Sequence, residues 1–237
     1  MNVADPSGTL AIFAKEPHPG RAKTRLIPAL GAEAAARLSA AFLNDLLPRL
    51  AAGLAPQTRM LLCYDPPEAA AHFATRIHAL HLHRRIDLLS QSPGDLGQRL
   101  AAVKSHVKAP VVFIGTDAPD LPIDFIITGL RYAQDGRAYL MKTADGGYAL
   151  LALPAQAPSR VFENIAWSTS ETARQQCDRI RAAGIDTRES ELVWWDVDEP
   201  ADLLPLRRRL EANPQLAPET LEALRSIGAL PGERPPL

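Results

Sequence analysis

Short apolar runs alternate with longer amphipathic segments along most of this 237-residue chain, and this alternation limits its fold more than any other feature. We predict strands at residues 9–14, 60–63, 86–89, 111–114, 138–141, 148–151 and 192–195. We predict helices at residues 32–50, 67–75, 95–107, 122–133, 168–183 and 199–210. Because parallel strands need long crossover connections that are usually helical, the pattern predicts an α/β fold in three layers (α/β/α), with a mostly parallel sheet covered on both faces.

The chain shows no internal repeat and no second regime of composition, so we expect one domain over residues 1–213. A proline-rich extension follows at residues 214–237, in which residues 218–227 are expected to form one short helix. Gly228 is expected to stop that helix, and the chain from Pro231 onward is expected to fray.

The charge balance excludes some classes of function. The chain has 26 Lys and Arg residues against 27 Asp and Glu residues, which gives a formal charge of −1. Near-neutrality argues against a nucleic-acid coat and against a polybasic membrane anchor. No apolar run approaches the ~18 residues that cross a bilayer, and two cysteines are too few for a disulfide scaffold. We therefore expect a cytoplasmic protein with no nucleic-acid partner and no membrane span, and the sequence leaves its oligomeric state open.

Basic residues are concentrated in the segment that follows the first predicted strand, residues 15–26 (KEPHPGRAKTRL). Against one acid, this segment has four basic residues: Lys15, Arg21, Lys23 and Arg25. Ligands of open parallel sheets bind at the carboxyl ends of the strands, and Arg and Lys at that position suit a di- or triphosphate. Gly20 allows the backbone to approach a ligand closely, and Thr24 offers a hydroxyl group. The alternative is a solvated basic loop without a ligand.

Aspartates follow two of the predicted strands. Asp117 lies just beyond the clearest strand, where its carboxylate would project into the ligand crevice and suit a hard divalent cation. After the last predicted strand, alternation of the extended chain places Asp196 and Asp198 on one side. If Asp117 and Asp198 converge, a cation between them would relieve their repulsion. The alternative for Asp198 is to cap the next helix, and Asp120 is predicted to cap the helix that follows it.

A glycine-containing segment, Asp145 to Tyr148, lies between two further predicted strands. Gly146 and Gly147 would let the backbone approach a sugar or an acceptor, with Asp145 as a base and Tyr148 as a packing surface. The alternative is a simple turn between the two strands.

Three further positions have both functional and structural explanations. Gly97 falls in the first turn of a predicted helix, where it is less stable than Ala by about 0.5–1 kcal/mol, which indicates close packing or the approach of a ligand. Trp167 can stack on a base or a sugar, and it can equally be a half-buried core residue. Ser168 and Glu171 match a capping box, which explains both residues without a function.

Six motifs, in order along the chain, resemble the DUF2064 family, whose members are glycosyltransferase-A-like and are often labelled radical-SAM/selenodomain-associated transferases. The motifs are FAKEP…PG…KTRL (13–26), GDLGQR (94–99), GTDAPDL (115–121), DGGY (145–148), WST (167–169) and DVD (196–198). The resemblance extends from about residue 9 to residue 206. It implies the Rossmann-like, nucleotide-binding fold of the nucleotide-diphospho-sugar transferases, which include the molybdenum-cofactor guanylyltransferases. It also implies a metal at Asp117, with Asp198 as the second ligand.

One segment departs from the family pattern. Many relatives have a Gly-Pro pair and an acidic residue before the DGGY motif, whereas this chain has the sequence MKTA at residues 141–144. The lysine in this segment, Lys142, is expected to affect which acceptor is tolerated.

From these residues we expect a transferase that depends on Mg²⁺ or Mn²⁺, uses a nucleotide donor such as a nucleotide sugar, and acts on a small-molecule acceptor. Asp117, Lys23 and Asp145 are expected to act in catalysis, and Asp117 and Asp198 to bind the metal, with Asp196 left open as an alternative to Asp198. The residues expected to bind substrate are Lys15, Gly20, Arg21, Lys23, Thr24, Arg25, Gly97, Gly146, Gly147, Tyr148 and Trp167. Two alternatives stay open: a nucleotidyltransferase that releases pyrophosphate from an NTP, and a non-catalytic nucleotide-binding module.

Overall fold

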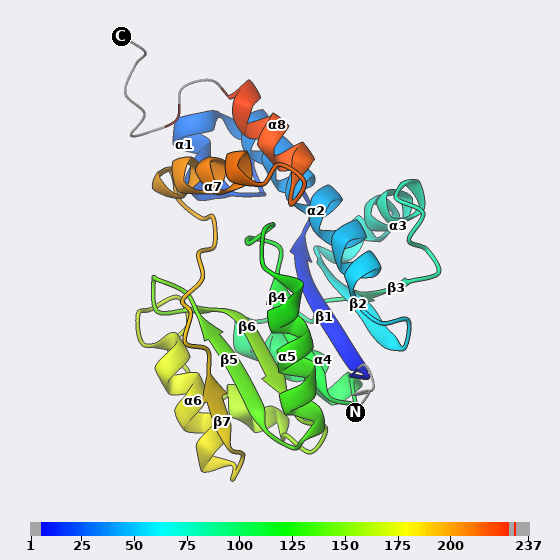
Figure 1. Ribbon diagram of the computed structural model, residues 1–237, viewed down its shortest axis with the longest axis vertical. Coiled ribbons are helices and arrows are strands. Elements are labelled where there is room, and N and C mark those ends of the chain that lie inside the picture. Colours follow the sequence, from blue (N-terminus) through cyan, green and yellow to red (C-terminus); the bar gives the residue numbers. More distant parts are fainter. Residues whose placement is uncertain (1–5, 228–229, 231–237) are drawn as a thin grey trace.

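The computed structural model describes residues 6–227 and residue 230, whose strands form one seven-stranded sheet in the order β3-β2-β1-β4-β6-β5-β7 (Figure 1). The strands are β1 (Gly8–Lys15), β2 (Thr58–Asp65), β3 (Ile86–Ser90), β4 (Val111–Gly115), β5 (Ala138–Lys142), β6 (Tyr148–Leu153) and β7 (Thr187–Glu189). Strands β1 to β4 pair in parallel, while β6 runs antiparallel to both β4 and β5. The α/β fold with a mostly parallel sheet is confirmed.

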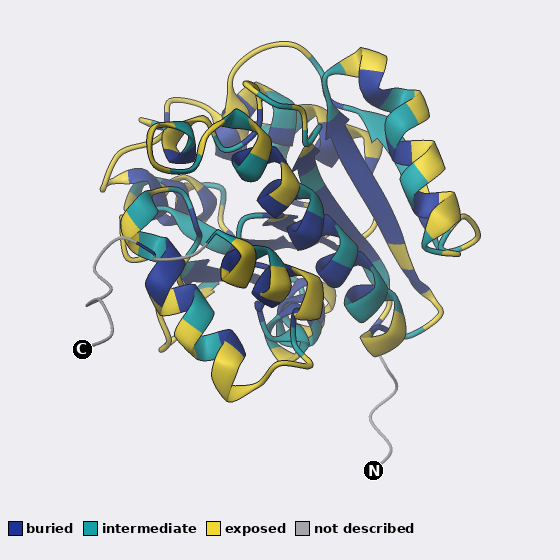
Figure 2. Cartoon of the chain, turned by 90° about the horizontal axis from the view of Figure 1, so that it is seen from above, coloured by how far each residue is buried: buried dark blue, intermediate teal, exposed yellow. Residues whose placement is uncertain are grey.

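Helices cover both faces of this sheet. They are α1 (Ile27–Leu30), α2 (Ala32–Gly53), α3 (Ala70–Ala79), α4 (Leu96–His106), α5 (Ile123–Gln134), α6 (Thr172–Ala182), α7 (Pro200–Ala212) and α8 (Pro218–Ser226), with 3-10 turns η1 (Thr24–Leu26), η2 (Pro67–Ala69) and η3 (Ser159–Phe162). Helices α2, α3 and α5 pack on one face, and α4 and α6 on the other. In Figure 2 the strands are buried between helices whose outer sides are exposed. None of the described helices combines the length and the apolar character needed to cross a membrane.

Strand β4 shows why the central strands are continuous apolar runs. Val112 and Ile114 join the cluster under α2, α3 and α5, whereas Val111 and Phe113 join the cluster on the opposite face. All four side chains are at most 3% exposed, because successive side chains of a strand point to opposite faces and both faces are covered. This packing fixes where the carboxyl end of β4 lies, and with it the position of Asp117.

A third apolar cluster lies beyond the carboxyl end of β1, where α1, α7, α8 and the first half of α2 pack together (Figure 1). It includes Phe42 of α2 and Leu224 of α8, each at most 1% exposed. Asp45 of α2 accepts hydrogen bonds from the backbone N–H groups of Glu219 and Thr220 at the start of α8. The C-terminal helix is therefore held on α2 by both apolar packing and a side-chain cap.

Helix α8 confirms the helix predicted at residues 218–227. The expected stop at Gly228 and the expected fraying from Pro231 lie outside the described residues. The division of the chain at residue 213 stays a prediction.

The strand predicted at residues 192–195 is wrong. The seventh strand is β7, which pairs in parallel with β5. In the predicted segment, three of the four residues are exposed, and Trp194 alone is joined to the sheet, by one bridge to Thr143. The true edge strand has the sequence Thr-Arg-Glu, and short charged strands are typical of sheet edges, where they discourage pairing with other chains.

The sequence predicted the start of helix α4 correctly and the start of helix α6 incorrectly. Helix α4 begins as predicted, because the Gln98 N–H donates to Asp95 Oδ1 (2.8 Å) and the Asp95 N–H donates to Gln98 Oε1 (2.9 Å). Helix α6 begins at Thr172 rather than at residue 168. Ser168 has a φ of 59°, a left-handed conformation that a right-handed helix does not contain, so the capping box predicted for Ser168 and Glu171 is wrong.

Two predicted caps are replaced by other contacts. Asp120 does not cap α5, whose N-cap residue is Pro122; its carboxylate is 2% exposed and accepts a hydrogen bond from Arg209 Nε at 2.7 Å. Glu199, and not Asp198, is the N-cap residue of α7. The carboxylate of Asp198 is therefore left for the site described next.

Candidate active site

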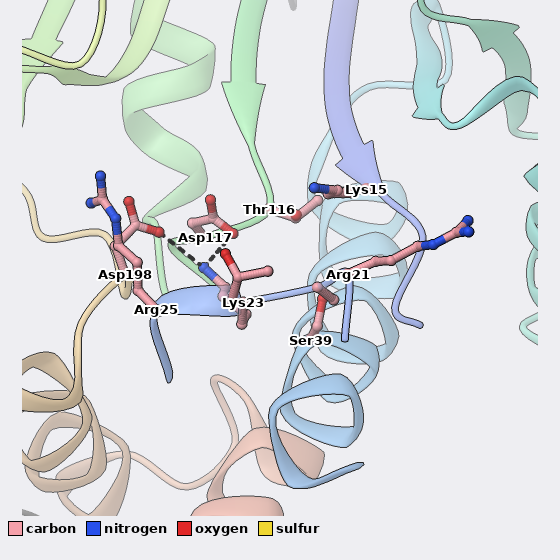
Figure 3. Close-up of a pocket in the computed structure, with 10 residues that line it drawn as sticks. Lys15, Arg21, Lys23, Arg25, Ser39, Thr116, Asp117 and Asp198 are labelled. Carbon is pink, nitrogen blue, oxygen red and sulfur yellow. Dashed lines mark hydrogen bonds and ion pairs between the residues drawn. The ribbon is translucent and has the colours of Figure 1, made fainter. Parts of the chain in front are cut away.

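A cavity of about 190 Å³ opens at the carboxyl ends of β1 and β4 (Figure 3). In it, basic residues that follow β1 face an aspartate that follows β4 and an aspartate that precedes α7. The lining residues are Lys15, Arg21, Ala22, Lys23, Thr24, Arg25, Ser39, Thr116, Asp117 and Asp198. The structure thus brings most of the predicted basic loop together with both predicted metal ligands.

Lys23 lies at the centre of this arrangement. Its Nζ is 2.5 Å from Asp117 Oδ1 and 3.4 Å from Asp198 Oδ1, and it donates a hydrogen bond to the carbonyl oxygen of Val197 at 2.5 Å. The Lys23 side chain is 6% exposed, whereas those of Asp117 and Asp198 are 46% and 42% exposed. The two carboxylates therefore converge on one buried ammonium group, as Figure 3 shows, while both stay accessible from the cavity.

The backbone around Lys23 fixes its side chain in this direction. Lys23 has φ 47° and ψ 47°, a left-handed conformation that is unfavourable by about 1–2 kcal/mol for a residue with a Cβ. Its neighbours Ala22 and Leu26 are at most 1% exposed, so their packing holds the loop in place. The Lys23 ammonium also lies 5.4 Å from the ring centre of Phe42 on α2.

The segments that contain Asp117 and Asp198 are joined through their backbones. The N–H of Val197 donates a hydrogen bond to the carbonyl oxygen of Asp117 at 2.9 Å. The Val197 side chain is 1% exposed in the helical cluster beside α7. Of the two residues adjacent to Val197 in the sequence, Asp198 lines the cavity that contains Lys23. Asp196 lines an adjoining pocket, and Asp117 lines both.

The acids in this region perturb one another's pKa values. Burial raises the pKa of Asp196 to about 6, and the charges of Asp198 and Asp145 add to the rise. Burial also raises the pKa of Asp198; Lys23 opposes this rise, whereas the charge of Asp117 adds to it. Acids with raised pKa values in a cavity are typical of functional sites, and an added cation would favour their ionised forms.

The donor set fits a hard divalent cation. Mg²⁺ takes oxygen ligands, often from one or two carboxylates, and completes its shell with water and phosphate oxygens. Asp117 and Asp198 supply such a pair, and Asp196 adds negative charge nearby. Within residues 6–227 and 230, no group of three His, Cys, Asp or Glu side chains is arranged to hold a metal ion. Two carboxylates fill only part of the coordination shell of such a cation, so water or a bound ligand would have to supply the rest.

Three other basic side chains line the cavity: Lys15, Arg21 and Arg25. The side chains of Lys15 and Arg21 form no hydrogen bond or ion pair with the part of the chain that the structure describes, and Arg25 lies near enough to Asp198 to oppose the rise in its pKa. Ser39 on α2 and Thr116 after β4 add hydroxyl groups to the same wall. Such a set can bind a polyphosphate through several charge-assisted hydrogen bonds.

An apolar pocket of about 270 Å³ lies on the other side of Asp117. It is formed between β1, β4, β6 and the start of α4, and it is lined by Phe13, Leu96, Leu100, Phe113, Ile114, Gly115, Asp117, Ala118, Tyr148, Ala149 and Asp196. Tyr148, a predicted substrate-binding residue, lies in this wall and donates from its hydroxyl to Gln176 Oε1 at 3.3 Å. Asp117 is thus shared between the cavity that Lys23 lines and an apolar pocket.

The Asp145 to Tyr148 segment forms the turn between β5 and β6 that the sequence allowed as an alternative. Asp145 Oδ1 accepts hydrogen bonds from the Thr143 hydroxyl (2.5 Å) and from the Gly147 N–H (3.0 Å). Gly146 has a φ of 90°, and a Cβ there would lie 2.2 Å from the carbonyl oxygen of Ser170. The glycine is therefore required by contact with the chain itself, and the base role of Asp145 stays a prediction.

Besides Gly146, Gly147 and Tyr148, three further predicted substrate residues do not line the Lys23 cavity: Gly20, Gly97 and Trp167. A Cβ on Gly97 would lie 2.7 Å from the carbonyl oxygen of Phe162 and 2.8 Å from Nε1 of Trp167, so close packing explains this glycine. Gly97 and Trp167 line a different pocket, which contains neither Lys23 nor Asp117. Gly20 lies in an exposed turn with a φ of 81° and does not line the cavity.

Lys142, the residue at which the chain departs from the family pattern, pairs with Glu189 of β7 at 2.5 Å. Arg181 of α6 donates to the same carboxylate at 2.8 Å. The Lys142 ammonium is therefore directed toward the sheet edge and contacts neither of the pockets that share Asp117.

Sequence reasoning missed two hydroxyl groups of the cavity. Thr116 is 8% exposed. Its position next to Asp117 in the GTDAPDL motif could have indicated that it belongs to the site. Ser39 is also 8% exposed, and it lies between Leu38 and Phe42 on the apolar face of the helix predicted at residues 32–50. A lone serine on such a face is the available signal for a polar contact.

Comparison with known proteins finds one family. Residues 49–169, about half of the chain, match the model of the family described as "Uncharacterized protein conserved in bacteria (DUF2064)". No curated protein matches the chain.

Comparison with solved structures finds the same architecture in several proteins. A "putative nucleotide-diphospho-sugar transferase from Desulfovibrio desulfuricans G20" is 28% identical with a TM-score of 0.78, over 92% of this chain and 94% of that one. The 4-diphosphocytidyl-2C-methyl-D-erythritol synthase of Anaerococcus prevotii DSM 20548 is 9% identical with a TM-score of 0.55, over 86% and 99% of the two chains. Rv0371c of Mycobacterium tuberculosis H37Rv is 17% identical with a TM-score of 0.50, over 86% and 98%. The last two likenesses concern the fold alone.

Proposed function

This chain belongs to the DUF2064 family, and from that membership and the geometry of the cavity we propose that it is a metal-dependent transferase with a nucleotide donor, of the nucleotide-diphospho-sugar glycosyltransferase kind. One observation supports the proposal most directly: Asp117 and Asp198 meet at Lys23 in a cavity lined by three further cations. The likeness to the Desulfovibrio protein supports the transferase class.

The basic residues would bind the phosphates of the donor. Arg21 and Arg25 each offer a planar fork of N–H donors that matches two phosphate oxygens, and Lys15 offers a point charge. Ser39 and Thr116 add neutral donors from the wall formed by α2 and β4. Groups that are already in place where negative charge develops usually make the largest contribution to catalysis, and here that charge develops on the leaving phosphate.

Asp117 and Asp198 would hold Mg²⁺ or Mn²⁺, with their carboxylates on the same side of the cavity. The bound cation would neutralise phosphate charge and orient the phosphate chain. Lys23 orients both carboxylates when no donor is bound, because its ammonium group contacts each of them. With a donor present, we propose that the same ammonium group donates to a phosphate oxygen.

The acceptor would bind on the other side of Asp117, in the apolar pocket of about 270 Å³ that Tyr148 lines. The Asp145 carboxylate, oriented by Thr143 and Gly147, is proposed to accept the proton of the attacking acceptor group. Phosphate and acceptor would thus approach the Asp117 end of β4 from two adjoining cavities.

The products identify the reaction. The protein would be incubated with Mn²⁺ and radiolabelled nucleotide sugars or nucleoside triphosphates, together with a mixture of small-molecule acceptors. Release of a nucleoside diphosphate indicates glycosyl transfer, and release of pyrophosphate indicates nucleotidyl transfer. Either product supports a transferase that uses a nucleotide donor.

A matched pair of variants makes this experiment specific to the cavity. Arg25→Met removes a cation from the cavity, whereas Arg131→Met removes one from the exposed side of α5. We expect the first variant to lose at least about tenfold in kcat/KM and the second to keep wild-type activity. If no donor yields a product and nucleotides bind equally well with and without Mn²⁺, the chain is instead a non-catalytic nucleotide-binding module.

A further inference from the structure

The loop between β4 and α5, which begins next to Asp117, is held by charged side chains from two helices. Arg49 of α2 donates from Nη2 to the carbonyl oxygen of Pro119 (2.7 Å) and from Nη1 to that of Leu121 (2.9 Å). Arg209 of α7 donates from Nε to Asp120 Oδ2 at 2.7 Å. The loop is thus fixed to α2 through its backbone and to α7 through the buried carboxylate of Asp120.

Helix α7 is the helix that Asp198 precedes. Its Arg209 contacts Asp120, three residues after Asp117, and its guanidinium group also lies 5.8 Å from the ring centre of Trp195, next to Asp196. The same two chain segments meet a second time, where the Val197 N–H donates to the carbonyl oxygen of Asp117. Arg209 therefore links the loop that begins at Asp117 with both ends of the segment that contains Asp198.

Stability alone is a poor explanation for this ion pair. Asp120 is 2% exposed at its side chain and Arg209 is 28% exposed, so both charges are largely removed from water. Asp120 Oδ1 and Arg209 Nη2 are buried without a hydrogen-bond partner among the described residues. Burying an ion pair with unsatisfied atoms is often no more stable than packing apolar side chains of similar size, so the pair points to a role in geometry.

We propose that Asp120 and Arg209 are positioning residues that hold the Asp117 segment against the Asp198 segment and so set the spacing of the two carboxylates. The consequence for metal binding and transfer rests on the proposed function. The structural part, the contact between the two segments, does not. Outer contacts of this kind usually change metal affinity or activity by about 10–100-fold when they are removed.

The test uses the full chain with Asp120→Asn, which keeps the shape of the side chain, and with Arg209→Lys, which keeps the charge. The matched control is Arg208→Met, because Arg208 is exposed on the same helix. The first readout is hydrogen exchange at the Val197 amide, measured by NMR, with the amides of Ile12 and Leu62 in the sheet as internal references. The second readout is the affinity for Mn²⁺ alone, measured by electron paramagnetic resonance.

In both pair variants we expect the Val197 amide to exchange at least about tenfold faster, while the reference amides keep their protection. We expect the Mn²⁺ dissociation constant to rise about tenfold or more, less in Arg209→Lys than in Asp120→Asn, and Arg208→Met to match the wild type. A role in stability alone would speed exchange at every amide and leave Mn²⁺ affinity unchanged in the folded protein. That result, or unchanged exchange at Val197, would overturn the inference. If the wild type binds no Mn²⁺ even in the presence of a nucleoside triphosphate, or transfers no donor group, the proposed function fails. The exchange at Val197 still decides the present inference.

Discussion

The Nζ of Lys23 lies 2.5 Å from Asp117 Oδ1, so a lysine ammonium group holds the position beside Asp117 where we propose that a divalent cation binds. The same group lies 3.4 Å from Asp198, the other proposed ligand. Lys23 and the cation must therefore compete for the two carboxylates. A phosphate, by contrast, can attract the lysine away from them. This competition predicts that removing a residue of the site increases its affinity for the metal.

Lys23→Met should raise the affinity for Mn²⁺ in the absence of nucleotide by about tenfold, which corresponds to ~1.4 kcal/mol, because the competing ammonium is gone. The same variant should weaken nucleoside triphosphate binding by a similar factor. Electron paramagnetic resonance measures the first quantity, and calorimetry the second. In Lys15→Met, which removes a cation of the same cavity that does not contact the aspartates, nucleotide binding should weaken without a gain in Mn²⁺ affinity. A loss of Mn²⁺ affinity in Lys23→Met would contradict the competition.

Asp196→Asn should stabilise the metal-free protein at neutral pH. The pKa of Asp196 is about 6 in the folded protein, against 3.8 for an ordinary aspartate, so the folded state binds this proton more tightly than the unfolded state. Stability therefore falls as pH rises from about 4 through 6. Because the Asp196 side chain is partly exposed, the effect on the free energy of unfolding is smaller than the full pKa shift would give. We therefore expect Asp196→Asn to gain about 1–2 kcal/mol of stability near pH 7.5 and almost none below about pH 4.

Urea unfolding in the presence of a chelator, at both pH values, measures this difference. Asp135→Asn at the exposed end of α5 is the control, and its effect should stay within about 0.5 kcal/mol at both pH values. An Asp196→Asn variant that is less stable than the wild type at neutral pH would show that the fold does not disfavour the ionised carboxylate.

Gly146→Ala should destabilise the fold by about 2–5 kcal/mol, because two penalties add. The φ of 90° is unfavourable for a residue with a Cβ, and the Cβ would lie 2.2 Å from the carbonyl oxygen of Ser170. Gly184→Ala isolates the first penalty, since Gly184 has a φ of 78° with open space around it, and about 1–2 kcal/mol is expected there. Thermal unfolding of the two variants side by side measures the difference. Equal losses would mean that the Ser170 backbone moves aside at little cost.

Local sequence patterns predicted the elements that position the site. The apolar run of β4 could be recognised because both of its faces are buried, and the rule that ligands bind at the carboxyl ends of parallel strands then placed Asp117 and the basic loop together. The contact of Lys23 with Asp117 and Asp198 was not predicted, because the sequence led us to expect a divalent cation between the two carboxylates.

Other parts of the site depend on contacts that no local pattern contains. Asp120 has the spacing of a helix cap, yet it pairs with Arg209, which is remote in the sequence and is brought near only by the packing of α7. The apolar segment 192–195 was misassigned because apolar residues there lie on the surface, while the true edge strand β7 is short and charged. Ser39 lines the cavity because of where α2 packs relative to β1. The sequence of the helix alone does not predict that packing.

The most direct test of the account is a thermal-shift measurement with a panel of nucleoside triphosphates and nucleotide sugars, with and without Mn²⁺, on the wild type and on Asp117→Asn. A donor at about 100 times its Kd should stabilise the wild type by roughly 2.7 kcal/mol, or about 5–10 °C for a chain of this size, when Mn²⁺ is present. The Mn²⁺-dependent part of that shift should disappear in Asp117→Asn. If Asp117→Asn kept the whole Mn²⁺-dependent shift, the metal would be bound elsewhere and the central claim would be contradicted.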